Sequence, residues 1–201
     1  MFIQGLFPIP LGHYNLDRNL NLEEINFIKD SYKNKKSIGT NNVSTDSYIL
    51  NNPSMILIKE FIESCLDLFL QEVDPISENS KIYITQSWLT FTDSGQSHHV
   101  HNHPNSYLSG VLYLEVDPKE DKLYFVNPHI RDLVVTKKQY TAFNSDEWSI
   151  PVTNGKLIIF PSNINHYVKE YNKDKTRISL AFNTFIKGIL GSEELLTELK
   201  L

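Results

Sequence analysis

Hydrophobic residues recur at helical spacing in two segments of the first 80 residues. The first stripe follows a capping-box-like start, Asn21 with Glu24, and comprises Leu22, Ile25, Ile28 and Tyr32. The second follows Asn52-Pro53, where proline suits the first helical position. It comprises Ile58, Phe61, Ile62, Cys65, Leu68 and Phe69. Each predicted helix has a single apolar face and is therefore expected to cover another element.

From residue 81 onward the pattern changes to short β-type runs separated by turn residues such as Asp93-Ser94-Gly95 and Asn154-Gly155. We predict strands at residues 82–92, 107–116, 122–126, 147–152, 156–160, 167–171 and 176–186. Many short strands without long helices between them indicate a sandwich or a barrel rather than a parallel sheet. A last helix is predicted over residues 193–200, with Ser192 as its cap.

The chain length of 201 residues suits one domain with a substantial core. The sequence contains no repeats, no low-complexity linker and no break in composition. We therefore expect a single domain, 1–201, with a helical N-terminal cover (1–80), a β core (81–186) and a C-terminal helical segment (187–201).

Composition narrows the expected partners. The formal net charge is −5 and no run of Lys or Arg occurs, which argues against nucleic acid as the main partner. We recognise no signal peptide, and no apolar run approaches the about 20 residues that a membrane span needs. The only cysteine, Cys65, lies in the second apolar stripe and is expected in the core. These features favour a cytoplasmic protein. A homodimer is only the commonest default for soluble oligomers.

Four histidines lie within six residues, in the segment His98-His99-Val100-His101-Asn102-His103. Residues i and i+2 of an extended segment point the same way, so either His99 with His101, or His101 with His103, would grip one ion. Taken alone, the cluster is equally compatible with a solvated polar loop. A third ligand must come from a distant strand, and His166 follows the buried-looking strand 156–160. An isolated histidine at that position is more often structural.

The strand at 176–186 alternates in character. Ile178, Leu180 and Phe182 share one face, which suits a covering of helices. The opposite face carries Arg177, Ser179, Ala181 and Asn183. If that face lines a barrel interior, the arginine requires an anion beside it. A guanidinium next to a hydroxyl suits a dicarboxylate. The surface of an edge strand would show the same alternation.

Together these features form a longer pattern. It consists of Ser87-Trp88, Gly95, His101-x-His103-Pro104-x-Ser106, Leu108-Ser109-Gly110-Val111-x-Tyr113, Asn127-Pro128, Gly155-x-Leu157-x-x-Phe160-Pro161 with His166, and Arg177-Ile178-Ser179 with Asn183. Over roughly residues 81–186 the chain resembles the 2-oxoglutarate/Fe(II)-dependent oxygenase superfamily. The closer similarity is to a group of bacterial and phage oxygenases known mainly from sequence.

The resemblance implies a mainly β fold, a double-stranded β-helix (a jelly-roll or cupin-like barrel) with the N-terminal helices packed on one sheet. It implies Fe(II), 2-oxoglutarate as co-substrate, O2, and hydroxylation of a substrate that the sequence does not identify. His166 maps onto the distal iron ligand. Arg177 maps onto the residue that binds the outer carboxylate of 2-oxoglutarate, with Ser179 beside it. Tyr113 and Asn183 are further candidates for contact with the co-substrate.

The chain departs from the superfamily at the second iron ligand. The usual His-x-carboxylate is His101-x-His103 here, which gives a neutral three-histidine face of His101, His103 and His166. Such a face leaves positions open for the co-substrate and O2, and imidazole suits Fe(II). Two alternatives stay open: ligation by His99 and His101, or an acidic residue such as Asp93 or Glu115 that completes the shell. The His-Pro-x-Ser continuation favours His101 with His103.

Two other functions fit the same pattern. One is a cupin-type three-histidine dioxygenase or isomerase in which Arg177 holds an anionic substrate directly. The other is a non-catalytic jelly-roll binding module. Substrate choice is expected to lie in loops such as residues 129–144. Aromatic residues that would wall the pocket, but are more typical of a core, are Trp88, Phe91, Tyr107 and Trp148.

Overall fold

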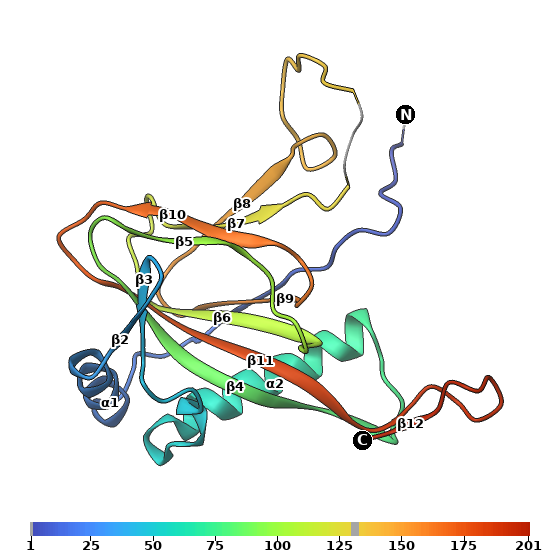
Figure 1. The fold of residues 1–201 in the computed structure, drawn as a ribbon, viewed down its shortest axis with the longest axis horizontal. Coiled ribbons are helices and arrows are strands. Elements are labelled where there is room, and N and C mark those ends of the chain that lie inside the picture. The colour runs from blue at the N-terminus through green and yellow to red at the C-terminus, as the bar shows by residue number, and fades with distance from the viewer. Residues whose placement is uncertain (1, 130–132) are drawn as a thin grey trace.

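The computed structural model describes residues 2–129 and 133–201 (Figure 1). Part of the predicted substrate loop at 129–144, residues 130–132, therefore lies outside the described residues. The helices are α1 (Leu22–Lys33) and α2 (Ile56–Val73), with 3-10 turns at Ile49–Asn51 and Pro53–Met55. The strands are β1 (Gly12–Asn15), β2 (Lys36–Ile38), β3 (Asn41–Val43), β4 (Ser80–Thr92), β5 (Gln96–His101), β6 (Leu108–Glu115), β7 (Lys122–Val126), β8 (Glu147–Pro151), β9 (Lys156–Pro161), β10 (His166–Tyr171), β11 (Arg177–Leu190) and β12 (Leu199–Lys200). Among the described helices, none combines the length and the apolar character needed to cross a membrane.

Two antiparallel sheets face each other (Figure 1). The larger has the order β1-β9-β6-β11-β4-β3-β2, with β12 paired to β11, and the smaller has the order β5-β10-β7-β8. Between β4 and β11 the chain passes back and forth between the sheets, which is the winding of a double-stranded β-helix. The predicted mainly β fold is therefore confirmed.

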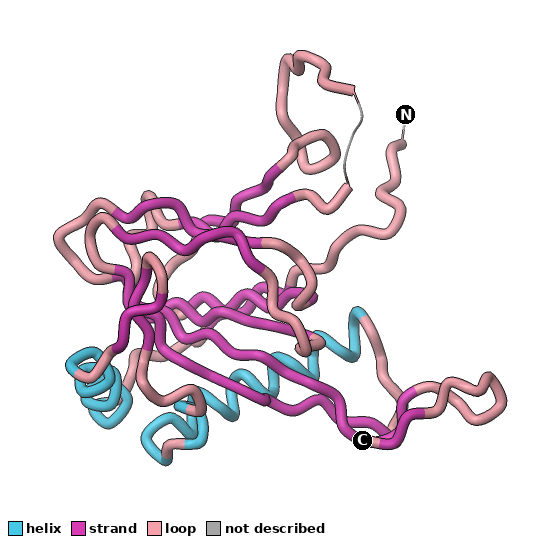
Figure 2. The backbone as a smooth tube through the Cα atoms, viewed as in Figure 1, coloured by secondary structure: helices cyan, strands magenta, loops and turns pink. Residues whose placement is uncertain are grey.

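Both helices lie on the outer face of the larger sheet (Figure 2). The stripe of α2 that includes Ile58, Ile62 and Cys65 is buried against Leu180 and Phe182 of β11 in one apolar cluster. Burying an aliphatic side chain of this size contributes about 1.5–3 kcal/mol. The predicted helix-facing side of β11 and the core position of Cys65 are thus confirmed, and burial raises the pKa of the Cys65 thiol to about 11.

The start of α1 is fixed by the predicted capping box. The backbone N–H of Glu24 donates to Asn21 Oδ1 (2.9 Å), and the N–H of Asn21 donates to Glu24 Oε2 (2.8 Å). Arg18 adds an ion pair of 2.6 Å to the fully buried Glu24 carboxylate. These bonds satisfy donors that a helix start leaves open and so fix where α1 begins.

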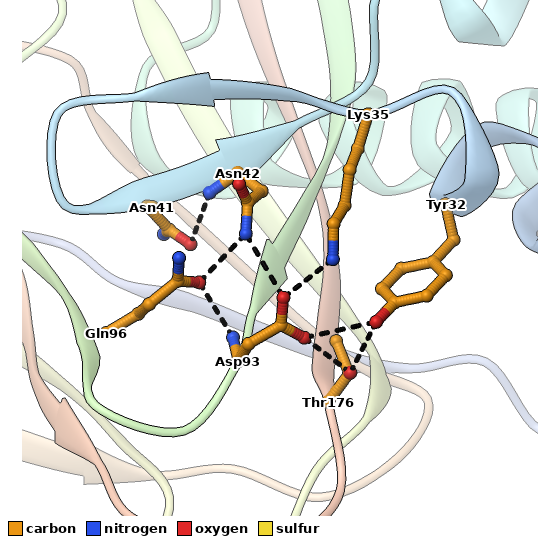
Figure 3. A network of polar contacts seen from close by, with 7 residues as sticks. All are labelled: Tyr32, Lys35, Asn41, Asn42, Asp93, Gln96 and Thr176. Atoms are coloured by element: carbon orange, nitrogen blue, oxygen red, sulfur yellow. Dashed lines mark hydrogen bonds and ion pairs between the residues drawn. The ribbon is translucent and has the colours of Figure 1, made fainter.

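A polar network joins the end of α1 to the barrel (Figure 3). Its centre is Asp93, in the turn after β4, which pairs with Lys35 Nζ at 2.6 Å and accepts a hydrogen bond from Thr176 Oγ1 at 2.6 Å. Asn42 of β3 donates to the same carboxylate (3.2 Å). Although partial burial opposes it, these bonds from Lys35 and Thr176 hold the pKa of Asp93 below its ordinary value. The network holds Thr176 in place, directly before Arg177 at the start of β11.

The prediction of a purely helical cover over residues 1–80 was wrong, because this region also contains strands. Three short strands, β1 to β3, extend the larger sheet on both sides. Each has only three or four residues, too few for an alternation pattern to identify a strand. The second helix also begins later than Asn52-Pro53, because Asn52 caps a 3-10 turn through Ser54 N–H (3.0 Å) and the α-helix starts at Ile56.

The predicted C-terminal helix at 193–200 was wrong. The chain turns back after Ser192, and β12 pairs with Ile189 and Leu190 of β11. Leu195 is 76 % and Leu196 is 92 % exposed, so a helix here would have no apolar surface to cover. Backbone bonds between Gly188 and Leu201, at 3.0 and 2.9 Å, form instead.

Candidate metal centre

Three histidines meet at one end of the barrel. His101 ends β5, His103 lies two residues beyond it, and His166 begins β10, where it pairs with His101. One ring nitrogen from each residue lies within 4.8 Å of the other two, and the Nε2 atoms of His103 and His166 are 3.3 Å apart. The structure thus brings together the three residues that the sequence proposed as ligands.

Backbone carbonyls orient two of the rings. The Nδ1–H of His101 donates to the carbonyl oxygen of His99 (2.8 Å), and the Nδ1–H of His166 donates to that of Ile164 (3.1 Å). A carbonyl can only accept, so each of these rings carries its lone pair on Nε2, and in His166 this atom faces His103 Nε2. This is how metal-ligating histidines are usually fixed.

The histidines are held in the neutral form that binds metal ions. Burial, with a contribution from His101, lowers the pKa of His166 to about 3 and that of His103 to about 4. Burial also lowers the pKa of His101, although its hydrogen bond to His99 opposes the shift. At neutral pH the three nitrogens therefore offer lone pairs without losing a proton first.

The alternative ligands do not join this group. His99 is exposed, so the structure brings His103 rather than His99 next to His101 and His166. Asp93 is committed to Lys35 and Thr176, and Glu115 is exposed at the far end of β6. Within residues 2–129 and 133–201, no carboxylate completes the three-histidine group.

A cavity extends from the histidines into the barrel. Arg177 and Ser179 of β11 line it together with Tyr113 of β6. Arg177 is 4 % exposed and β11 lies between β4 and β6 in the sheet, so the alternative of a surface arginine on an edge strand was wrong. The Arg177 guanidinium lies over the Tyr113 ring, 5.6 Å from its centroid, and Arg177 Nη1 is 3.7 Å from Asp121 Oδ1.

Two buried polar atoms in this cavity lack a hydrogen-bonding partner among the described residues. They are Arg177 Nε and the hydroxyl oxygen of Tyr113. Tyr113 is fully buried, and burial raises the pKa of its phenol to about 12, so it stays a neutral donor. Leaving such groups unpaired costs about 1–3 kcal/mol each, which indicates that the cavity is built for an anionic or polar ligand.

The structure does not group Asn183 with the other predicted co-substrate residues. It lies on the same face of β11 but does not line the cavity, and its Oδ1 accepts a hydrogen bond from Ser109 Oγ (2.9 Å). Ser109 bonds in turn to Ser162 Oγ (2.7 Å), and the Ser162 carbonyl accepts the backbone N–H of His103 (2.9 Å). Asn183 therefore belongs to a network that holds the His103 loop.

Several residues in or next to the cavity were not predicted as site residues from the sequence. Thr90 and Thr92 of β4 lie beside Ser179 and Arg177 on the inward face, and the alternation of β4 would have revealed them. His98 stacks on His101 with ring centroids 4.2 Å apart. Asp121, which pairs with Arg177 across the barrel end, lies in a connection that carries no sequence signal.

The four aromatic residues considered as pocket walls lie in different parts of the structure. Trp88 lines the cavity, 6.0 Å from the His103 ring, whereas Phe91 is fully buried in the helix-facing core. Tyr107 packs beside that core, and its hydroxyl bonds Asp74. Trp148 lines a different cavity, near the N-terminus.

Comparison with known proteins agrees with this geometry. Residues 86–183 match the family model described as "Putative 2OG-Fe(II) oxygenase". No curated protein sequence matches the chain significantly. Among solved structures, the epimerase SnoN in complex with Fe3+, alpha ketoglutarate and nogalamycin RO is 10% identical, with a TM-score of 0.62 and coverage of 95% of this chain and 86% of that chain.

Two further structures share the fold. A Pseudomonas putida prolyl-4-hydroxylase is 13% identical, with a TM-score of 0.56 and coverage of 87% and 92%. HygX from Streptomyces hygroscopicus, with nickel, 2-oxoglutarate and hygromycin B bound, is 9% identical, with a TM-score of 0.56 and coverage of 86% and 82%. The family match spans the strands that carry the three histidines and Arg177, and over residues 86–183 the chain is similar to the 2OG-Fe(II) oxygenases.

Proposed function

We propose that His101, His103 and His166 hold Fe(II), and that Arg177, Ser179 and Tyr113 bind 2-oxoglutarate, in an oxygenase that hydroxylates a substrate not yet identified. The observation that carries this proposal is the pair of unpartnered buried atoms, Arg177 Nε and the Tyr113 hydroxyl, in a cavity that opens onto three neutral histidines. Bound together, Fe(II) and 2-oxoglutarate supply the O2-dependent oxidising chemistry of the family.

The donor set fits a divalent iron ion. Three imidazoles on one side leave the remaining positions open for a chelating keto acid and O2. Because these ligands carry no charge, the ion would keep its full positive charge and attract an anion more strongly than a site with a carboxylate. Orientation by the His99 and Ile164 carbonyls supports a preorganised site.

The cavity fits the far carboxylate of 2-oxoglutarate. Arg177 offers Nε and the rest of its planar guanidinium, and the Tyr113 hydroxyl adds a neutral donor. Ser179, on the same face two residues after Arg177, supplies another hydroxyl. Asp121 holds the outer side of the guanidinium, which orients the remaining donors inward.

The test is an anaerobic titration of the apo-protein with Fe(II) and then 2-oxoglutarate, monitored by the visible charge-transfer band of the chelate. We expect the band in the wild type and its loss in His166→Ala. Arg177→Ala should require roughly 100-fold more 2-oxoglutarate, because hydrogen bonds to a charged group are lost. His13→Ala, which removes an exposed histidine on β1, is the matched control and should behave as wild type.

The other outcomes select between the alternatives. Iron binding without a band would contradict the use of 2-oxoglutarate and favour a cupin-type three-histidine enzyme. Absence of iron binding would leave the non-catalytic binding module as the better explanation.

A further inference from the structure

A second cavity of about 620 Å³ lies beside the histidine centre, and the proposed chemistry does not use it. It is enclosed by the N-terminal segment at residues 5–11, the end of β7 and the segment at residues 142–148. Figure 1 shows the N-terminal segment running past the ends of β7 and β8, and Figure 2 shows it as loop. We refer to this space as the N-terminal cavity.

The N-terminal cavity adjoins the proposed metal centre through two of its lining residues. Phe125 pairs with His166 in the smaller sheet, and their rings are 6.1 Å apart. Ile164, also in the lining, provides the carbonyl that orients His166. A molecule in this cavity would therefore lie one side chain away from a proposed iron ligand.

The described lining is mainly apolar and also includes the polar side chains of Asn127, His129 and Ser145. Its apolar members are Leu6, Phe7, Pro8, Ile9, Leu11, Phe125, Val126, Pro128, Ala142, Phe143, Trp148 and Ile164. Among the described residues that line it, none is Lys or Arg, and the only carboxylate is that of Glu147. A hydrogen bond from Tyr167 lowers the pKa of Glu147, which therefore stays anionic. An anionic ligand would lose part of its hydration here and would meet the Glu147 carboxylate, with no lysine or arginine among the described lining residues to offset the loss.

The rim of the cavity holds a strained and exposed aromatic residue. Phe7 has a φ of 55°, in the left-handed region that bulky residues rarely adopt, and its side chain is 89 % exposed. Backbone strain of this kind costs about 1–3 kcal/mol and tends to cluster at ligand sites. A ligand that covers the Phe7 ring would recover apolar burial that the free protein lacks.

From these observations we infer that the N-terminal cavity binds the substrate, and that the substrate is a neutral, largely apolar molecule rather than an anionic metabolite, a nucleotide or an acidic peptide. The volume is that of a site for a drug-sized molecule, and mouths of β-barrels are common places for such sites. This inference rests on the proposed function, because it places the substrate next to the same metal centre.

The test uses two dyes that share one ring skeleton. N-phenyl-1-naphthylamine is neutral, and 1-anilinonaphthalene-8-sulfonate adds a sulfonate. We expect the full chain, loaded with Fe(II) and 2-oxoglutarate without O2, to bind the neutral dye roughly ten-fold more tightly by fluorescence titration. The neutral dye should also shift the charge-transfer band of the loaded enzyme.

Variants locate the dye. Phe7→Ser and Trp148→Ser should each weaken binding of the neutral dye by roughly five-fold or more, because apolar contact area is lost. Phe2→Ser is the matched control: Phe2 lies in the same segment and is 85 % exposed, but it does not line the cavity. Its variant should bind the dye as wild type does.

The result separates this inference from the proposed function. A normal charge-transfer band with equal binding of both dyes, or with no effect of Phe7→Ser, would overturn the inference and leave the oxygenase assignment standing. Neutral-dye binding without any band would contradict the proposed function and, with it, the role of this cavity in substrate binding. Sedimentation that shows a dimer lost in Phe7→Ser, without dye binding, would make the cavity an interface between two copies and overturn the inference.

Discussion

At the scale of single residues, the barrel interior contains polar groups that the protein alone does not satisfy. Arg177 is surrounded by Tyr113, Ser179 and Asp121, yet its Nε has no partner among the described residues. In folded proteins such buried groups are usually paired, because each unpaired group costs stability. Their persistence indicates that ligand binding, rather than stability, determines these positions.

Removing the Tyr113 hydroxyl should change stability and co-substrate binding in opposite directions. Tyr113→Phe removes a buried hydroxyl that makes no hydrogen bond of normal geometry with any described residue, so the apo-protein should become more stable by about 1 kcal/mol, which corresponds to a melting temperature about 2–4 °C higher. The same variant should bind 2-oxoglutarate roughly ten-fold more weakly, because a hydrogen bond to the carboxylate is lost. Thermal unfolding of the apo-protein and the charge-transfer titration measure the two effects.

Tyr83→Phe is the control, because Tyr83 lies on β4 with 41 % exposure. It should change neither quantity. A lower melting temperature in Tyr113→Phe would mean that the hydroxyl has a partner in the apo-protein, and it would contradict its assignment to the co-substrate.

Taken singly, the histidine cluster, His166 and Arg177 each fitted an ordinary structural role, and only the longer family-like pattern grouped them as site candidates. The structure brings the three histidines together and places Arg177 in the lining of the same cavity. Asp121 could not be predicted, since nothing along the chain relates it to Arg177, 56 positions later in the numbering. The position of Asn183 outside the cavity could not be predicted either. It depends on hydrogen bonds to Ser109 and, through it, to Ser162, which lie on distant segments of the chain.

At the scale of elements, one glycine explains how β6 and β11 pack under the helices. Gly110 of β6 pairs with Phe182 of β11, and the Phe182 ring lies over it. A Cβ placed on Gly110 would lie 2.3 Å from Phe182 Cζ, far inside van der Waals contact. Phe182 is fully buried, so its ring cannot swing into solvent.

We therefore expect Gly110→Ala to destabilise the protein by about 1–3 kcal/mol in urea unfolding, the usual cost of overpacking a core. Adding Phe182→Leu should recover part of this loss, so that the double variant is less destabilised than the sum of the two single variants. Gly5→Ala, whose added Cβ would make an ordinary contact of 3.6 Å with Phe143, should have little effect. Additive losses in the double variant would mean that the two residues do not compete for the same space.

Elements were predicted best where their pattern was long. The strands β4 and β11 have 13 and 14 residues, and the long β-type runs that predicted them cover most of each strand. The strands β1 to β3 are short, and pairing with β9 and β4, rather than their own pattern, makes them strands. The C-terminal segment had a helix cap in Ser192, but backbone pairing with Gly188 and Leu190 competed successfully with helix formation.

At the scale of the whole molecule, the winding of the chain brings four neutral histidines together, one of them buried and three partly buried. His98, His101, His103 and His166 all have lowered pKa values, with burial as the largest cause. The unfolded chain would have these imidazoles in water, with ordinary pKa values near 6.5. Below that pH, the unfolded chain therefore binds protons that the metal-free folded protein does not bind.

This difference predicts that the apo-protein loses stability as the pH falls from 7.5 to 5.5. A group whose pKa is lower in the folded state destabilises folding progressively, from the unfolded pKa near 6.5 down to the folded value, which for His166 is about 3. Each histidine that stays neutral should contribute a slope approaching about 1.4 kcal/mol per pH unit below 6.5. Urea unfolding with a chelator present measures the slope, which His166→Gln should reduce by about one such contribution. Equal slopes in wild type and His166→Gln would show that His166 takes up its proton in the folded state, which would contradict the neutral three-histidine face on which iron binding depends.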